Sequence, residues 1–247
     1  MTESSGEEHI WLAPERGFPN QGAFGIALKI HQALTAGRES AWLYWQLSEG
    51  TERALGALTD SRAQDSSPKF AAAKHFFRHI RPGARRLEVD VKGSSTLLAS
   101  AYLHPGTAAL TVVLINPTPA VQTVLLHSLP VAQDARLLDA WTSSPSSTWQ
   151  ASVVPVQDGG ASVTIPGYGL VTLVGTGASV GDAGASAVPA ATVLGERTEG
   201  HDSARSEGCA CRRGCGPRPR AAFLPVAGGF LIPLGRLRRR HRPGKRW

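Results

Sequence analysis

The sequence Ser-Ala-Trp-Leu-Tyr-Trp-Gln, at residues 40–46, indicates the fold more directly than any other stretch of this chain. Five apolar or aromatic residues follow one another there without a break. Such a run is typical of a strand that is covered on both faces, as in a parallel sheet. Strand alternation places Trp42 and Tyr44 on one face and Trp45 on the other.

Helices are predicted on both sides of this strand. Upstream, apolar residues recur at helical spacing from Ala23 to Leu34, and Gly37 follows as a C-cap. Downstream, Ser67-Pro68 predicts the start of a helix over 69–80, with Phe70, Ala73, Phe77 and Ile80 on its buried face. One central strand needs parallel neighbours, and residues 1–21 supply none. The segment is therefore expected to be the last piece of an α/β structure whose beginning is missing.

Residues 84–176 have a different character. Short runs rich in Val, Leu and Thr recur every 8–12 residues, separated by turn sequences such as Asn116-Pro-Thr-Pro and Asp158-Gly-Gly. This pattern predicts an antiparallel β-sandwich. The expected strands are 86–91, 96–103, 110–116, 123–126, 136–142, 152–156, 162–165 and 170–174.

The net charge of +7 over 247 residues belongs to the end of the chain. No acidic residue follows Glu207, and 11 of the 26 Lys and Arg lie there, which leaves residues 1–207 with 15 basic and 19 acidic groups, a net of −4. Nucleic-acid binding by the whole chain is therefore disfavoured. The N-terminus lacks the pattern of an export signal.

The order of motifs resembles glycoside hydrolase family 30 over residues 1–176. Met1-Thr-Glu3 resembles the end of the family's seventh barrel strand, and residues 40–46 resemble its eighth. Phe76-Phe-Arg-His-Ile-Arg-Pro-Gly83 is similar to the family's helix-end signature. The motifs that resemble its side β-domain are Leu98-Ala-Ser-Ala-Tyr102, Val112-Val-Leu-Ile-Asn116, Ala140-Trp-Thr-Ser-Ser144 and Ile165-Pro-Gly-Tyr-Gly-Leu-Val-Thr-Leu173.

The resemblance implies a fold of the α/β plus all-β class. Residues 1–82 would be the C-terminal remnant of a (β/α)8 barrel, and 83–176 an antiparallel β-sandwich. A disordered linker is expected over 177–207 and a Cys- and Arg-rich tail over 208–247.

The implied chemistry is retaining hydrolysis of β-glycosidic bonds in xylan, β-glucan or glucosylceramide-like substrates. By family position Glu3 is the nucleophile, whereas the acid/base Glu belongs to strand four, which this chain lacks. Because two carboxylates must cooperate in such a reaction, the chain by itself is expected to be inactive. The alternative is a stand-alone β-sandwich module that binds carbohydrate or is anchored at a surface.

Aromatic and histidine side chains leave further alternatives open. Trp45 and Trp42 are candidates for a sugar-binding floor, and core packing is the other interpretation, favoured for Trp42. For Trp141 and Trp149, packing in the core or at an edge is favoured over an exposed carbohydrate-binding platform. His75 and His79 have the spacing of a metal pair, but no third ligand accompanies them. No metal and no cofactor are expected.

The tail contains all three cysteines, Cys209, Cys211 and Cys215. Gly208-Cys209, a weakly apolar segment and Arg236-Leu-Arg-Arg-Arg240 resemble the myxobacterial C-terminal sorting signal. This resemblance implies attachment of residues 208–247 to a membrane or cell surface and a secreted or cell-surface location. A shift of reading frame would produce the same features, and three thiols without a His make a poor zinc site.

Overall fold

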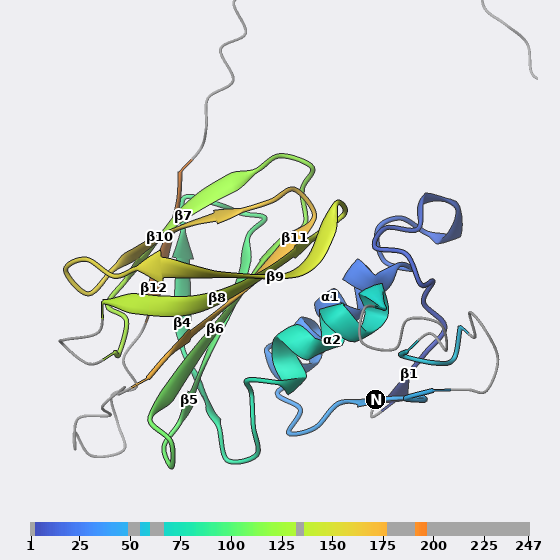
Figure 1. Cartoon of the computed structure of the whole chain (residues 1–247), viewed down its shortest axis with the longest axis horizontal. Coiled ribbons are helices and arrows are strands. Elements are labelled where there is room, and N and C mark those ends of the chain that lie inside the picture. Colours follow the sequence, from blue (N-terminus) through green and yellow to red (C-terminus); the bar gives the residue numbers. More distant parts are fainter. Residues whose placement is uncertain (1–2, 49–54, 60–66, 132–135, 177–190, 197–247) are drawn as a thin grey trace, which may run out of the picture. The chain divides into compact units, whose positions relative to one another are not determined.

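The computed structural model describes residues 3–48, 55–59, 67–131, 136–176 and 191–196; for Glu3 and residues 191–196 it describes the backbone alone. This part is mostly sheet, with two α-helices (Figure 1). The elements before the large sheets are β1 (Glu3–Ser4), the 3-10 helix η1 (Pro14–Arg16), α1 (Ala23–Leu34), β2 (Leu43–Tyr44) and α2 (Pro68–Phe77).

Ten strands follow and form two sheets. The six-stranded sheet has the order β3 (Arg85–Leu87), β5 (Leu98–His104), β6 (Ala109–Asn116), β11 (Gly169–Gly175), β8 (Leu137–Ser144) and β9 (Ser147–Pro155). The four-stranded sheet has the order β10 (Ala161–Ile165), β7 (Gln122–His127), β12 (Ala191–Glu196) and β4 (Val89–Lys92). Neighbouring strands pair antiparallel except for β12 with β4.

Two hydrophobic clusters meet at the six-stranded sheet. One cluster joins Val112 and Leu114 of β6 to Val124 and Leu126 of β7 in the other sheet. The second joins Val113 and Ile115 of β6 to α1 and α2. Because side chains alternate along a strand, β6 contributes one row to each cluster and is buried on both faces.

Helix α2 is covered on two sides, which the periodicity did not indicate. It packs against α1 and also contacts β8, β9 and β11. Ala72, His75 and Phe76 are therefore buried, whereas Phe77, which the pattern placed on the buried face, is 38% exposed. The prediction of a single apolar stripe on this helix is wrong, because the helix lies between α1 and the six-stranded sheet.

Strand β2 also differs from the prediction of a strand covered on both faces. Trp42 and Tyr44 pack against the cluster of α1 and α2. Leu43, Trp45 and Leu47, which alternate with them along the chain, are 60%, 56% and 64% exposed. The alternation of the side chains is as expected, but one face of this short parallel pair is open.

Most predicted strands of residues 84–176 are present, with two changes. The expected strand 86–91 is interrupted at Glu88, so that β3 belongs to one sheet and β4 to the other. Residues 191–196, which the sequence assigned to a linker, form β12 between β7 and β4. This strand was not predicted, because its short run of strand-forming residues stands among Gly, Ala and Ser residues that are typical of a linker. The rest of the predicted linker, 177–190 and 197–207, and the tail 208–247 lie outside the described residues.

Candidate active site

The predicted nucleophile and a predicted sugar-binding residue lie at the same edge of a two-stranded parallel sheet. Glu3 pairs with Leu43 and Ser4 with Tyr44. The Trp45 backbone N–H then donates to the Ser4 carbonyl, with an N···O distance of 2.9 Å. In α/β structures with parallel strands, functional groups gather where the strands end. Trp45 thus follows β2 directly and bonds to Ser4, the residue after Glu3, although the Glu3 side chain lies outside the described part.

The two candidate tryptophans are not brought together. Trp45 is exposed on the open face of β2, whereas Trp42 lies on the helix side. The Trp42 ring centroid is 5.9 Å from that of Tyr44 and 5.9 Å from that of Phe77. Trp42 therefore occupies a packing position, and Trp45 has the exposure that a sugar ring would need.

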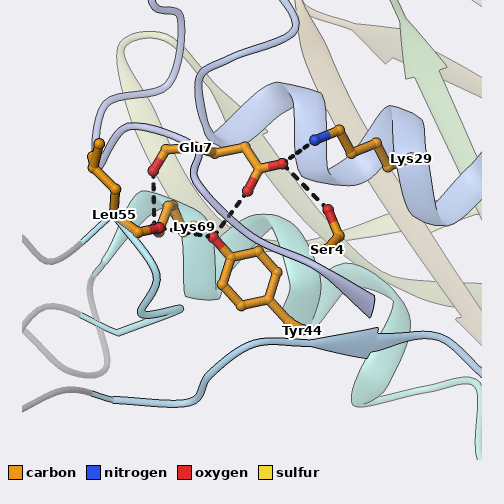
Figure 2. A network of polar contacts seen from close by, with 6 residues as sticks. All are labelled: Ser4, Glu7, Lys29, Tyr44, Leu55 and Lys69. Atoms are coloured by element: carbon orange, nitrogen blue, oxygen red, sulfur yellow. Dashed lines mark hydrogen bonds and ion pairs between the residues drawn. The ribbon is translucent and has the colours of Figure 1, made fainter. Parts of the chain in front are cut away.

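A buried carboxylate, Glu7, holds the segments around this edge together (Figure 2). Its Oε1 accepts a hydrogen bond from Lys29 Nζ of α1, and its Oε2 accepts one from Tyr44 Oη of β2 at 2.9 Å. Ser4 Oγ of β1 lies 3.5 Å from Oε1. Lys69 Nζ of α2 donates to the backbone carbonyls of Glu7 and Leu55, each at 2.9 Å.

Electrostatics fix the charge states in this network. Burial raises the pKa of Glu7, but hydrogen bonds from Lys29 and Tyr44 and the charge of Lys29 outweigh it, so that the pKa lies below its usual value. Burial and the Glu7 charge raise the pKa of Tyr44. Glu7 is therefore an ionised acceptor and Tyr44 a neutral donor at neutral pH.

Glu7 does not have the accessibility of a nucleophile. Its side chain is fully buried and its two oxygens are occupied by Lys29 and Tyr44, so a substrate carbon cannot approach it. This network was not predictable from local pattern, because an acid in a polar N-terminal stretch and a lysine at the start of a helix normally face solvent.

A second polar network connects α2 to the six-stranded sheet. The buried His75 ring lies 2.8 Å from Thr172 Oγ1 through Nδ1 and 2.8 Å from Ser143 Oγ through Nε2. Thr172 Oγ1 donates to the His75 carbonyl, and Ser143 Oγ accepts the Trp149 N–H. Donor and acceptor roles then agree if His75 is neutral and carries its proton on Nδ1.

This arrangement leaves His75 without a free nitrogen for a metal. Among the described residues, no group of three or more His, Cys, Asp or Glu is placed to hold a metal ion. The His79 ring packs instead on Trp141 with a centroid distance of 4.3 Å, and Trp141 stacks on Trp149 at 5.7 Å. The two tryptophans pack against each other in the β8–β9 hairpin, and Trp149 also contacts His75 of α2.

Three histidines are held neutral by the fold. Burial lowers the pKa of His75 to about 3; burial, with nearby positive charge, lowers the pKa values of His31 and His79 to about 4. The unfolded chain takes up protons on these groups near pH 6.5, whereas the folded chain does not.

Stability is therefore expected to be greatest above about pH 7 and to fall as the pH decreases from 6.5 towards 4. His75 alone contributes about 2 kcal/mol of the loss between pH 7 and pH 5. Urea unfolding at pH 7, 6 and 5 measures this dependence, which should be shallower in a His75→Gln variant. Equal free energies of unfolding at pH 5 and pH 7 would show that these histidines are not held neutral.

Within the part of the chain that the structure describes, no helix has the length and apolar character needed to cross a membrane.

Comparison with known proteins identifies the fold. No family model matches the sequence. Similar solved structures include the family 30 subfamily 8 xylanase of Clostridium acetobutylicum (20% identity, TM-score 0.56), a family 30 endoxylanase of Clostridium papyrosolvens (18%, 0.52) and the catalytic domain of family 30 xylanase C from Talaromyces cellulolyticus (21%, 0.56). Each match covers 71% of this chain and 40–42% of the xylanase. The chain thus spans about two fifths of the length of these enzymes, and over that span it has a fold like that of family 30 glycoside hydrolases.

Proposed function

We propose that this chain forms the C-terminal part of a retaining β-glycosidase of the family 30 kind, with Glu3 as the nucleophile. The observation that carries the proposal is the parallel pairing of β1 with β2, in which Glu3 is opposite Leu43 and Trp45 bonds to the next residue of β1, Ser4. The fold shared with the xylanases agrees with it. Xylan, β-glucan and glucosylceramide-like molecules are the proposed substrate classes, and a secreted or cell-surface location stays a prediction.

The open face of β2 supports the view that residues 1–82 are part of a barrel. A parallel sheet is normally covered on both faces, and here α1 and α2 cover one of them. Leu43, Trp45 and Leu47 form an exposed apolar row on the other. In the proposed enzyme further parallel strands close the barrel, and the side chain of Trp45 points into it, where it forms the floor for a sugar ring. Residues 83–176 are the accompanying β-sandwich.

The proposed reaction is a double displacement. A Glu3 carboxylate oxygen attacks the anomeric carbon as the bond from that carbon to the leaving oxygen breaks, and water later hydrolyses the glycosyl ester. An acid/base carboxylate about 5–5.5 Å from the nucleophile protonates the leaving oxygen and then activates the water. We assign that role to a carboxylate of another barrel strand, because the nearby Glu7 is buried and paired. Turnover of natural glycans by residues 1–247 alone is expected to be negligible.

Aryl glycosides with a dinitrophenolate leaving group test the proposal without the acid, since this group departs without a proton. The chain is expected to release up to one equivalent of dinitrophenolate from the β-xyloside or the β-glucoside, and the more reactive of the two indicates the substrate class. A Glu3→Gln variant should lose this reaction, because an amide is not a nucleophile of this kind. Equal release by the Glu3→Gln variant would contradict the role of Glu3, and Glu8→Gln is the matched control.

A further inference from the structure

A cavity of about 680 Å³ opens at the end of β2 that is remote from Trp45. It lies among the last turns of α1 and α2, the segment that precedes β2, and the start of β3. Trp42, Phe77 and Tyr102 contribute aromatic side chains to its lining. Its volume lies within the range of small-molecule sites, about 300–1,000 Å³. The cavity is separate from the edge at which Glu3 and Trp45 lie.

The charged residues that line the cavity are mainly basic. Arg38, Arg81 and Arg86 line it, and Glu39 is the one acid among the described lining residues. No ion pair connects any of these three arginines to a carboxylate within the described part of the chain. Arg81 donates to the Phe77 carbonyl at 3.0 Å and has other N–H groups to offer. Three guanidinium groups around one hollow favour an anionic occupant.

A buried tyrosine lies in the same wall. Tyr102 is 4% exposed, and its Oη is enclosed beside the Ser100 hydroxyl on the same face of β5. Arg86 is directly opposite Tyr102 in the pairing of β3 with β5, so the two residues share one face of the sheet. Tyr102 and Arg86 therefore form one wall of the cavity together.

We propose that this cavity binds a small organic anion that consists of a six-membered ring and a carboxylate, with the carboxylate held by Arg86 and Arg81 and the ring against Trp42 and Phe77. Guanidinium groups match carboxylates in geometry, and aromatic side chains cover the apolar face of a ring. A uronic acid sugar and an aromatic acid share this chemistry. The proposal does not depend on the role of Glu3.

Calorimetric titration of the full chain tests the site with two pairs of probes. Glucuronate is compared with glucose, and benzoate with benzamide, so that each pair differs in the charge. Each anion should bind at least about tenfold more tightly than its uncharged partner, since a charge-assisted hydrogen bond is lost in the latter. Tighter binding of glucuronate would identify a sugar ligand, and tighter binding of benzoate an aromatic one. Absence of binding by both anions would overturn the proposal.

Variants locate the site. Arg86→Gln and Arg81→Gln should each weaken binding of the preferred anion about tenfold. Arg85→Gln is the matched control, because Arg85 is exposed, precedes Arg86 in the same strand and does not line the cavity. Trp45→Ala should leave the affinity unchanged, which separates this site from the Glu3 edge. Equal effects of Arg85→Gln and Arg86→Gln, in variants that melt like the parent, would contradict the assignment.

Discussion

Replacement of Glu7 by Gln is expected to lower the free energy of unfolding by about 3 kcal/mol. The carboxylate is fully buried and accepts hydrogen bonds from Lys29 and Tyr44. An amide offers one acceptor where the carboxylate offers two, and its NH2 group faces a donor. This decrease in the free energy of unfolding is at the lower end of the range for a broken buried ion pair. The reason is that the Lys29 side chain is 39% exposed, so water can solvate its charge.

Urea unfolding at pH 7 measures the effect, and the adjacent acid supplies the control. Glu8 pairs with Arg16 at 3.1 Å, and both side chains are partly exposed. A surface pair of this kind contributes between 0 and about 1 kcal/mol, so Glu8→Gln should change little. If the two variants were equally stable, the network around Glu7 would not hold the segments near Glu3 in place.

Replacement of His75 by Ala is expected to destabilise the chain by roughly 3 kcal/mol. The change removes both side-chain hydrogen bonds between α2 and the six-stranded sheet and leaves the hydroxyls of Ser143 and Thr172 with fewer partners. It also opens a cavity between the helix and the sheet. The variant therefore loses polar and packing contacts at the same place.

His79, in the turn directly after α2, provides the comparison. Its side chain is half-buried, its Nε2 has no hydrogen-bond partner among the described residues, and its ring packs on Trp141. His79→Ala should therefore cost roughly 1 kcal/mol. Amide hydrogen exchange should show faster opening of α2 and the β8–β9 hairpin in His75→Ala than in His79→Ala. A larger effect of His79→Ala on exchange would contradict the role given to His75.

The regular parts of this fold follow from local pattern. Seven of the eight strand runs expected between residues 84 and 176 are present as single strands, because turn sequences and alternating Val, Leu and Thr mark them in the sequence. The interruption at Glu88 was not predictable, since a strand that changes sheets keeps its composition. Strand β12 was missed because a strand in the middle of a sheet is recognised by its neighbours more than by its own six residues.

The burial of individual residues was harder to predict than the elements. The apolar run at 41–45 was expected to be covered on both faces, with core packing one of two interpretations for Trp45, and the structure leaves Leu43 and Trp45 exposed. Lys69 is fully buried and bonded to two backbone carbonyls, which nothing in the helical pattern indicates. Periodicity indicates which residues share a face, whereas burial depends on what the fold places against each face.

The parallel pairing of the strands that carry Glu3 and Trp45 was predictable, but the Glu7 network beside them was not. The resemblance to family 30 placed the two residues at the ends of neighbouring parallel strands, and the pairing of Glu3 with Leu43 agrees with it. In the Glu7 network, the partners Lys29, Tyr44 and Lys69 are separated from Glu7 by 22, 37 and 62 positions in the sequence. Such contacts leave no periodic signal in one sequence.

If Glu3 is the nucleophile, as proposed above, a reagent that reacts with such a carboxylate labels it covalently. A 2-deoxy-2-fluoro xyloside with a dinitrophenolate leaving group transfers its sugar to a nucleophilic carboxylate, and the electron-withdrawing fluorine slows hydrolysis of the ester formed. Peptide mapping by mass spectrometry then locates the label. We expect slow labelling of Glu3 in the folded chain, none on Glu7 or Glu8, and none in Glu3→Gln. The proposal fails if the chain stays unlabelled, or if Glu3→Gln or a chain unfolded before the reagent is added is labelled to the same extent.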